Sequence, residues 1–335
     1  MARGPLRLSV LDLFPVGSGH APTDAIRDAV SLARRVDELG YFRYWIAEHH
    51  NMAGIASSAP EVLITHVAGQ TRRIRVGAGG IMVPNHAPLH VVEIFRTLEA
   101  LFPGRIDLGL GRAPGTDPVT SAALRRGTAD VDSALAELFA FARGELPAGH
   151  PYAEIVAMPS DAAVPPIWML GSTQAGARIA ARHGLGFAFA GHFAMAEAEG
   201  AMERYRVESD PAAGPYAILA LSVVCADTAA RAEELAAPLR LAYARIARGV
   251  RGPFPSVEEA ALHPLSREDR VLSARMGRGL VVGTPETVKA ELEAHATRLG
   301  ADEIMVSTIM GDVGERIASY ERLARAFSLE ESRSS

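Results

Sequence analysis

The alternation of short apolar runs with longer helical segments is the feature that most constrains the fold of this 335-residue chain. Eight runs rich in β-branched, aromatic and other apolar residues are each followed by a segment of helical periodicity. No break in composition separates the units, so the sequence predicts one domain over residues 1–335, an α/β fold of the TIM (β/α)8 barrel type with insertions. A doubly wound open sheet with a second domain is the main alternative. The predicted strands are 6–11, 42–47, 74–77, 105–110, 167–170, 185–190, 217–225 and 303–308.

Helical periodicity and two irregular stretches fill the intervals between these strands. The predicted helices are 23–39, 59–71, 88–101, about 117–143, 173–183, 193–207, about 227–248, 284–299 and 313–327. Residues 144–166 are rich in Gly and Pro, and residues 249–278 also lack periodicity. We expect both stretches to be irregular excursions from the barrel and to line the substrate pocket.

The residues that follow each predicted strand are candidates for a site, because active sites of barrels lie at the carboxyl ends of the strands. Glycine, hydroxyl, imidazole and one cationic side chain gather there, which predicts a large ligand with an anionic group. We expect the cofactor to contact Asp12, Ala78, Gly79, Gly80, Arg112, Gly171, Ser172 and Thr173.

The segment after the fifth strand is the best phosphate candidate. A strand runs into Gly171, then Ser172 and Thr173, and then a helix whose free N–H groups favour an anion. Arg112, after the preceding strand, can supply a cation. The alternative is a plain helix cap at Ser172 or Thr173 with a tight turn at Gly171.

The Glu48-His49-His50 sequence contains residue types that bind metals, but its spacing is unfavourable. Adjacent residues of an extended chain point to opposite sides, so only one of the two histidines is expected to face the pocket, as a proton donor or acceptor. We expect no metal site. Four other histidines show no motif spacing, and most of them are expected to be structural or exposed: His86, His90, His183 and His192, the last of which follows the sixth predicted strand.

Composition excludes several classes of function. The net charge is −5, and no basic run exceeds two residues, so we expect no nucleic-acid partner. Cys225 is the single cysteine, which excludes an intramolecular disulfide. The start makes a poor signal peptide, and no apolar run approaches the roughly 20 residues of a membrane span. We therefore expect a cytoplasmic protein without a membrane partner.

The motifs taken together resemble the bacterial-luciferase-like flavin-dependent monooxygenases, over residues 6 to 325 and in the family's order. The resemblance is carried by residues 47–51 (AEHHN), 76–88 (VGAGGIMVPNHAP), 102–106 (FPGRI), 109–117 (GLGRAPGTD) and 170–172 (LGS). It is closest to luciferase-like oxidoreductases that emit no light, because Gly111 stands where the light-emitting enzymes have a reactive cysteine.

The resemblance implies roles for single residues. Gly79-Gly80 matches the place where the family has a non-prolyl cis peptide bond under the flavin ring. Arg112 and 171–173 match the phosphate end of the flavin, and His49 matches an active-site histidine.

The resemblance also implies a reaction. A separate flavin reductase would supply reduced FMN, oxygen would add at the flavin C4a carbon, and the resulting (hydro)peroxyflavin would oxidise a small organic substrate such as an aldehyde or ketone. The protein would be a homodimer. A deazaflavin-dependent dehydrogenase or reductase, or a flavin-binding protein without catalysis, remains an alternative.

Overall fold

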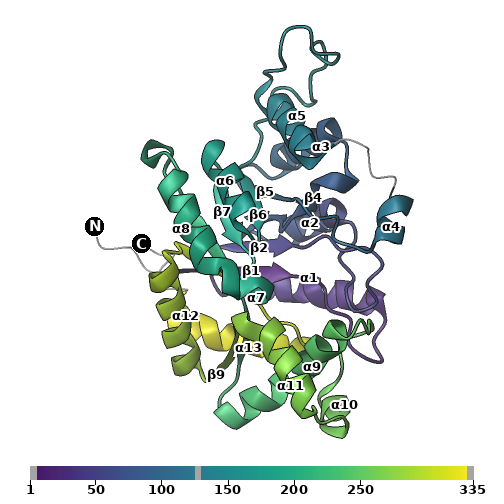
Figure 1. Cartoon of the computed structure of the whole chain (residues 1–335), viewed down its shortest axis with the longest axis vertical. Helices are drawn as coiled ribbons and strands as arrows, with labels where there is room; N and C mark the ends of the chain where they lie inside the picture. Colours follow the sequence, from purple (N-terminus) through teal and green to yellow (C-terminus); the bar gives the residue numbers. More distant parts are fainter. Residues whose placement is uncertain (1–5, 125–129, 330–335) are drawn as a thin grey trace.

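The computed structural model describes residues 6–124 and 130–329. Eight parallel strands form a closed barrel with helices around it (Figure 1). Their order is β10-β1-β2-β3-β5-β6-β7-β8, and pairing of β8 with β10 closes the ring. This confirms the TIM barrel. The barrel strands are β1 (Arg7–Asp12), β2 (Arg43–Ile46), β3 (Arg75–Ala78), β5 (Ile106–Gly111), β6 (Ile167–Gly171), β7 (Gly186–Phe189), β8 (Ala217–Cys225) and β10 (Glu303–Ser307).

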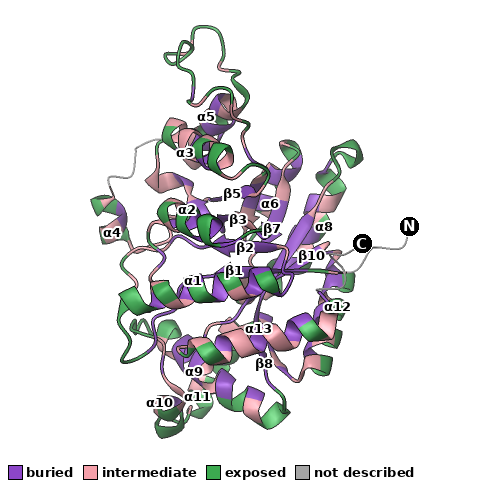
Figure 2. Cartoon of the chain, turned by 180° about the vertical axis from the view of Figure 1, so that it is seen from behind, coloured by how far each residue is buried: buried purple, intermediate pink, exposed green. Residues whose placement is uncertain are grey.

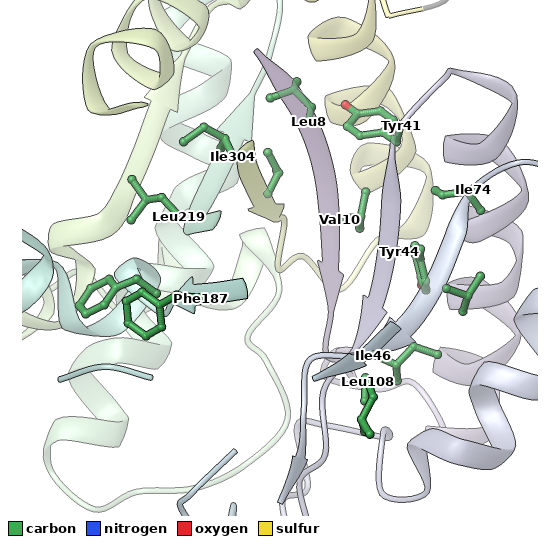
Figure 3. Packing of buried hydrophobic residues seen from close by; sticks show 14 of the residues in the cluster. Leu8, Val10, Tyr41, Tyr44, Ile46, Ile74, Leu108, Phe187, Leu219 and Ile304 are labelled. Atoms are coloured by element: carbon green, nitrogen blue, oxygen red, sulfur yellow. The ribbon is translucent and has the colours of Figure 1, made fainter. Parts of the chain in front are cut away.

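Two shells of apolar side chains result from the alternation of residues along the strands. Leu8 and Val10 of β1 point outward and pack with the outward residues of β2 and the surrounding helices (Figure 3). Leu11 points inward and packs with Trp45 and Met305 in a separate cluster inside the barrel. Both faces of every barrel strand are therefore buried, as is usual for parallel sheets (Figure 2).

The helices cover the outside of the barrel with their apolar sides inward (Figure 2). The α-helices are α1 (Pro22–Glu38), α2 (Pro60–Gln70), α3 (Pro88–Leu101), α4 (Pro118–Ala123), α5 (Val131–Arg143), α6 (Gln174–Arg182), α7 (Gly191–Ala194), α8 (Ala198–Glu208), α9 (Ala229–Ala247), α10 (Val257–Leu262), α11 (Arg267–Met276), α12 (Pro285–Leu299) and α13 (Val313–Phe327). Short 3₁₀ helices are η1 (Val83–Asn85), η2 (Met195–Glu197), η3 (Pro211–Ala213) and η4 (Gly277–Gly279). In the described part of the chain, no helix combines the length and apolar character needed to cross a bilayer.

Two strands were not predicted. β4 (Ile81–Met82) follows Gly79-Gly80 and pairs with the end of β5; its two residues are too few to form a recognisable pattern. β9 (Leu280–Gly283) pairs with the carboxyl-terminal half of β8, outside the closed ring. It exists because β8 is longer than the other strands and its end needs a hydrogen-bonding partner.

Three helical predictions need correction. The predicted helix at 117–143 consists of α4 and α5, and residues 125–129 lie outside the described residues. The one predicted at 193–207 is divided into α7, η2 and α8. The excursion at 249–278 is not wholly irregular, because α10 and α11 lie in it. Ser256 and Ser266 cap these helices by accepting hydrogen bonds from the N–H groups of Glu259 and Asp269, a serine-to-acid spacing that sequence analysis overlooked.

Residues 144–166 contain no helix or strand and project from the body beyond α5, at the top of Figure 1. The 249–278 segment, by contrast, is tied to the barrel. Backbone hydrogen bonds join Phe254 to Val16 and Ser18, in the loop after β1. The two excursions thus differ in kind, one projecting and one packed.

Candidate functional site

A cavity of about 300 Å³ lies inside the barrel at the carboxyl ends of the strands. Small-molecule sites of barrels occupy this position. Six of the predicted site residues line it: His49, Gly79, Arg112, Gly171, Ser172 and Thr173. They come from loops and strands that are far apart in sequence, and closure of the barrel brings them together.

The wall of the cavity at Gly79 is bare backbone. A Cβ atom at this position would lie 2.8 Å from Leu11 Cδ1 and 3.0 Å from Trp45 Cβ, so a side chain there would displace Leu11. The Gly79–Gly80 peptide bond is cis, as the resemblance predicted. The indole ring of Trp45 is held in place, since its Nε1 donates a hydrogen bond to Asp107 Oδ2 at 3.1 Å. The result is a rigid surface that a flat ring can approach closely.

Hydrogen-bond donors gather on the side of the cavity formed by β5 and β6. Ser172 and Thr173 precede α6, and Thr173 is its N-cap without a side-chain capping bond. Arg112 has one ion pair, 3.3 Å from Nη2 to Asp132 Oδ1, while its enclosed Nε has no partner among the described residues. Free helix N–H groups, hydroxyls and a guanidinium are the groups that bind a phosphate.

His49 provides an imidazole on the cavity wall. Its Nδ1 lies 3.2 Å from the Gly115 carbonyl oxygen, which can only accept, so Nδ1 carries the proton of the neutral ring and Nε2 is left as an acceptor. Burial lowers the pKa of His49, against the opposing effects of the Gly115 hydrogen bond and of Glu48. His49 is therefore neutral at neutral pH. His50 turns away, as predicted, and contacts Glu48 with its Nε2 at 2.9 Å.

Glu48 is a fully buried carboxylate that joins the loop after β2 to β4 and the turn that follows it. It accepts hydrogen bonds from the Met82 N–H at 2.7 Å, from Asn85 Nδ2 at 3.0 Å, and from His50 and His86. Burial by itself would raise the pKa of Glu48, but these bonds, led by that from His86, outweigh it and lower the pKa. His86 is thus a structural partner of the site. Among the described residues, no group of three or more His, Cys, Asp or Glu is placed to hold a metal ion.

Three predicted contacts lie away from the cavity wall. The Asp12 carboxylate faces outward, where it accepts hydrogen bonds from Arg316 Nη2 at 2.7 Å and from the Tyr44 hydroxyl. Ala78 belongs to the outer core. Gly80 packs against the backbone of β5. Asp12 and Ala78 lie away from the cavity for the same reason. Leu11 and Gly79 face inward, so their neighbours along the chain face outward.

Sequence reasoning missed several lining residues. His192, which was given no role in the predicted site, lines the cavity beside Phe189 and Phe193, and Met82 and Met305 line it from other strands. Strand alternation would have found Met305, whereas His192 lies in the four-residue helix α7, which is too short to show a repeating pattern. The described lining of this cavity contains no residue of 144–166 or 249–278, whereas residues 255–258 line a second cavity beside the loops after β1 and β10. That the excursions line the substrate pocket stays a prediction.

Comparisons with known proteins agree over most of the chain. The family model that matches residues 6–303 is described as luciferase-like monooxygenase. The protein YvbT of Bacillus subtilis is 43% identical, with 95% of each chain covered. A luciferase-like monooxygenase of Escherichia coli K12 is 38% identical, covering 94% of this chain and 95% of that protein. The crystal structure of apo-MsnO8 has a TM-score of 0.88 at 36% identity, with 97% and 98% covered.

Proposed function

The chain belongs to the luciferase-like monooxygenase family and is a flavin-dependent oxidoreductase, and from this premise we propose that it is an FMN-dependent monooxygenase. It uses reduced FMN and O₂ to place one oxygen atom on a small organic substrate such as an aldehyde or ketone. We propose further that a separate reductase delivers the reduced FMN. The enzyme is proposed to act as a cytoplasmic homodimer, which light scattering coupled to size-exclusion chromatography would test.

The observation that carries the proposal is the group of hydrogen-bond donors, including the Arg112 Nε that has no partner among the described residues, beside a bare wall. Arg112, Ser172 and the amino end of α6 suit a phosphate, and Gly79 suits a ring that lies flat against the backbone. A flavin mononucleotide carries both groups, a phosphate and a flat ring, on one molecule.

The choice between FMN and a deazaflavin rests on charge. Proteins of this fold bind either cofactor. A diketocamphane monooxygenase is solved with FMN, and an F420-dependent alcohol dehydrogenase is solved with an F420–acetone adduct. In the described lining of our cavity, Arg112 is the single guanidinium or ammonium group. One cation and one helix terminus match a lone phosphate better than a phosphate followed by an anionic tail.

The protein's own residues bind, orient and exclude water. Arg112, Ser172 and Thr173 hold the phosphate, while Gly79 supports the ring. When bound, reduced FMN supplies the electrons that activate oxygen. Leu13, Phe189 and Met82 keep the reacting end apolar and exclude water. His49 is neutral, and its Nε2 takes up a proton at the reacting end of the cavity and returns it.

Two titrations test the function. FMN is expected to bind the purified protein, and a 5-deazaflavin with an anionic tail is expected to bind far more weakly; flavin absorption and fluorescence report both. The FMN complex is then photoreduced and mixed with O₂ in the presence of candidate ketones and aldehydes, and ¹⁸O incorporation is measured by mass spectrometry. Tight deazaflavin binding without FMN binding would overturn the choice of cofactor, and the absence of ¹⁸O in every product would overturn oxygenation.

A further inference from the structure

The cavity has two chemically different sides. The polar groups proposed to hold a phosphate lie at the ends of β5 and β6. Over β7, β8 and β10 the described lining is apolar apart from one imidazole, that of His192. The apolar residues on this second side, named here the β7 side, are Ala188, Phe189, Ala190, Phe193, Ala220 and Met305.

His192 stands across the barrel from His49. In the closed strand order, β2 and β7 are four strands apart in a ring of eight, and the two histidines follow these two strands. The backbone that carries His192 is held from outside by η4: a Cβ atom at Gly279 would overlap the Gly191 carbonyl and lie 3.0 Å from the His192 Cα. A ligand in the cavity therefore meets an imidazole on either side.

The ring of His192 is enclosed and incompletely bonded. Its Nδ1 is closed off from the cavity and has no hydrogen-bond partner of normal geometry among the described residues, so Nε2 is the ring nitrogen left for a ligand. Burial, with a smaller effect of His49, lowers the pKa of His192 to about 4, while the Ala220 backbone acts in the opposite direction. The ring is therefore neutral at neutral pH, and its Nε2 can donate or accept one hydrogen bond without attracting a negative charge.

We propose that the β7 side is the substrate subsite of this enzyme and that His192 recognises the single oxygen of an uncharged, otherwise apolar substrate. This rests on the proposed function, since it presumes that the flavin occupies the polar side. A neutral imidazole among alkyl and phenyl groups stabilises a carbonyl or hydroxyl oxygen, whereas a carboxylate there would lose its hydration without gaining a cation. His192 is thus assigned as a specificity-determining residue.

The test uses four cyclohexane derivatives of similar size: cyclohexanone, cyclohexanol, methylcyclohexane and cyclohexanecarboxylate. Binding is measured by calorimetry and by flavin difference spectra, with and without oxidised FMN. The variants are His192→Phe, which keeps the ring shape, and His192→Gln, which keeps a hydrogen-bonding group. His183→Phe is the matched control, because this half-buried histidine packs against Phe139 outside the cavity lining.

We expect wild type and the His183 control to bind the ketone or the alcohol about tenfold more tightly than methylcyclohexane, and the carboxylate more weakly than either. His192→Phe should remove this preference while FMN affinity stays within about twofold, and His192→Gln should restore part of it. The comparison of ketone with alcohol shows whether His192 donates or accepts.

Three results would overturn the subsite. They are an unchanged preference in His192→Phe, tighter binding of the carboxylate, or no binding of either oxygen-bearing probe to the wild type. Failure of the proposed function would look different: wild type would not bind FMN, while the probe titrations without flavin still report on His192.

Discussion

Nε2 of His86 lies 3.0 Å from each carboxylate oxygen of Glu48, and this contact joins the turn after β4 to the loop after β2. Glu48 directly precedes His49, so a buried charge fixes the loop that carries the proposed proton acceptor. Asn85 extends the connection to the third loop, because its Nδ2 also donates to the Pro114 carbonyl at 3.0 Å. The position of His49 thus depends on residues from three strand ends.

Glu48→Gln is expected to destabilise the fold by about 1–3 kcal/mol, because its amide nitrogen would face another donor, either the Met82 N–H or Asn85 Nδ2. The loss should depend on pH. The pKa of Glu48 is lowered, so the carboxylate adds stability above its usual value of 4.5 and loses it as pH falls through the folded value. The pKa of His86 is raised: burial opposes this, but the hydrogen bond to Glu48 and its charge outweigh burial. Its contribution is complete below the usual 6.5 and is lost as pH rises through the folded value.

The difference in the free energy of unfolding between wild type and Glu48→Gln should therefore be largest between about pH 4.5 and 6.5. Urea unfolding followed by circular dichroism measures this difference. Glu154→Gln, at an exposed position, is the control and should change stability by less than about 0.5 kcal/mol. A difference that stayed constant from acidic to alkaline pH would contradict a charged Glu48–His86 pair.

Arg112→Gln tests the phosphate end. Loss of the guanidinium should weaken FMN binding about 10- to 100-fold, the effect of one charge-assisted hydrogen bond. Riboflavin, which has no phosphate, should bind both forms equally. Arg143→Gln on α5 removes an exposed arginine and serves as control. Fluorescence titration with both flavins measures the effect, and an equal loss of riboflavin affinity would show that Arg112 shapes the cavity instead.

Gly79→Ala tests the bare wall. The new methyl group would lie 2.8 Å from Leu11 Cδ1 and 3.0 Å from Trp45 Cβ, so we expect a loss of about 1–3 kcal/mol in stability. FMN affinity should fall as well, because the methyl group or the displaced Leu11 narrows the cavity. Gly252→Ala is the matched control, since a Cβ atom there meets nothing within 4 Å. Thermal unfolding and FMN titration measure both effects, and normal FMN affinity in Gly79→Ala would exclude ring contact at this wall.

His49→Gln tests proton transfer. Because burial lowers the pKa of His49, the neutral imidazole should persist below the usual pKa of 6.5, and wild-type turnover should decline only at more acidic pH. The variant should lose about 10²- to 10⁴-fold in kcat and should lack this acidic decline. The pH profile of turnover of a validated substrate gives the measurement, with exposed His90→Gln as control. Retention of the acidic decline in His49→Gln would assign it to another group.

The eight barrel strands and the polar strand ends could be predicted from sequence because each depends on neighbouring residues. Apolar runs, the glycines at 79–80 and the serine before α6 are local signals. β4 and β9 could not be predicted, because each exists only through pairing with a strand already in the barrel.

The sequence by itself determined the order of the strands and which residues reach their carboxyl ends. Tertiary structure decided which of those residues face the cavity. One step along β1 separates inward Leu11 from outward Asp12, and only the closed barrel distinguishes the two faces. Closure also brings Glu48 to His86, 38 residues away, and places His192 opposite His49. Such contacts depend on strand register and ring closure, which join segments that share no local pattern.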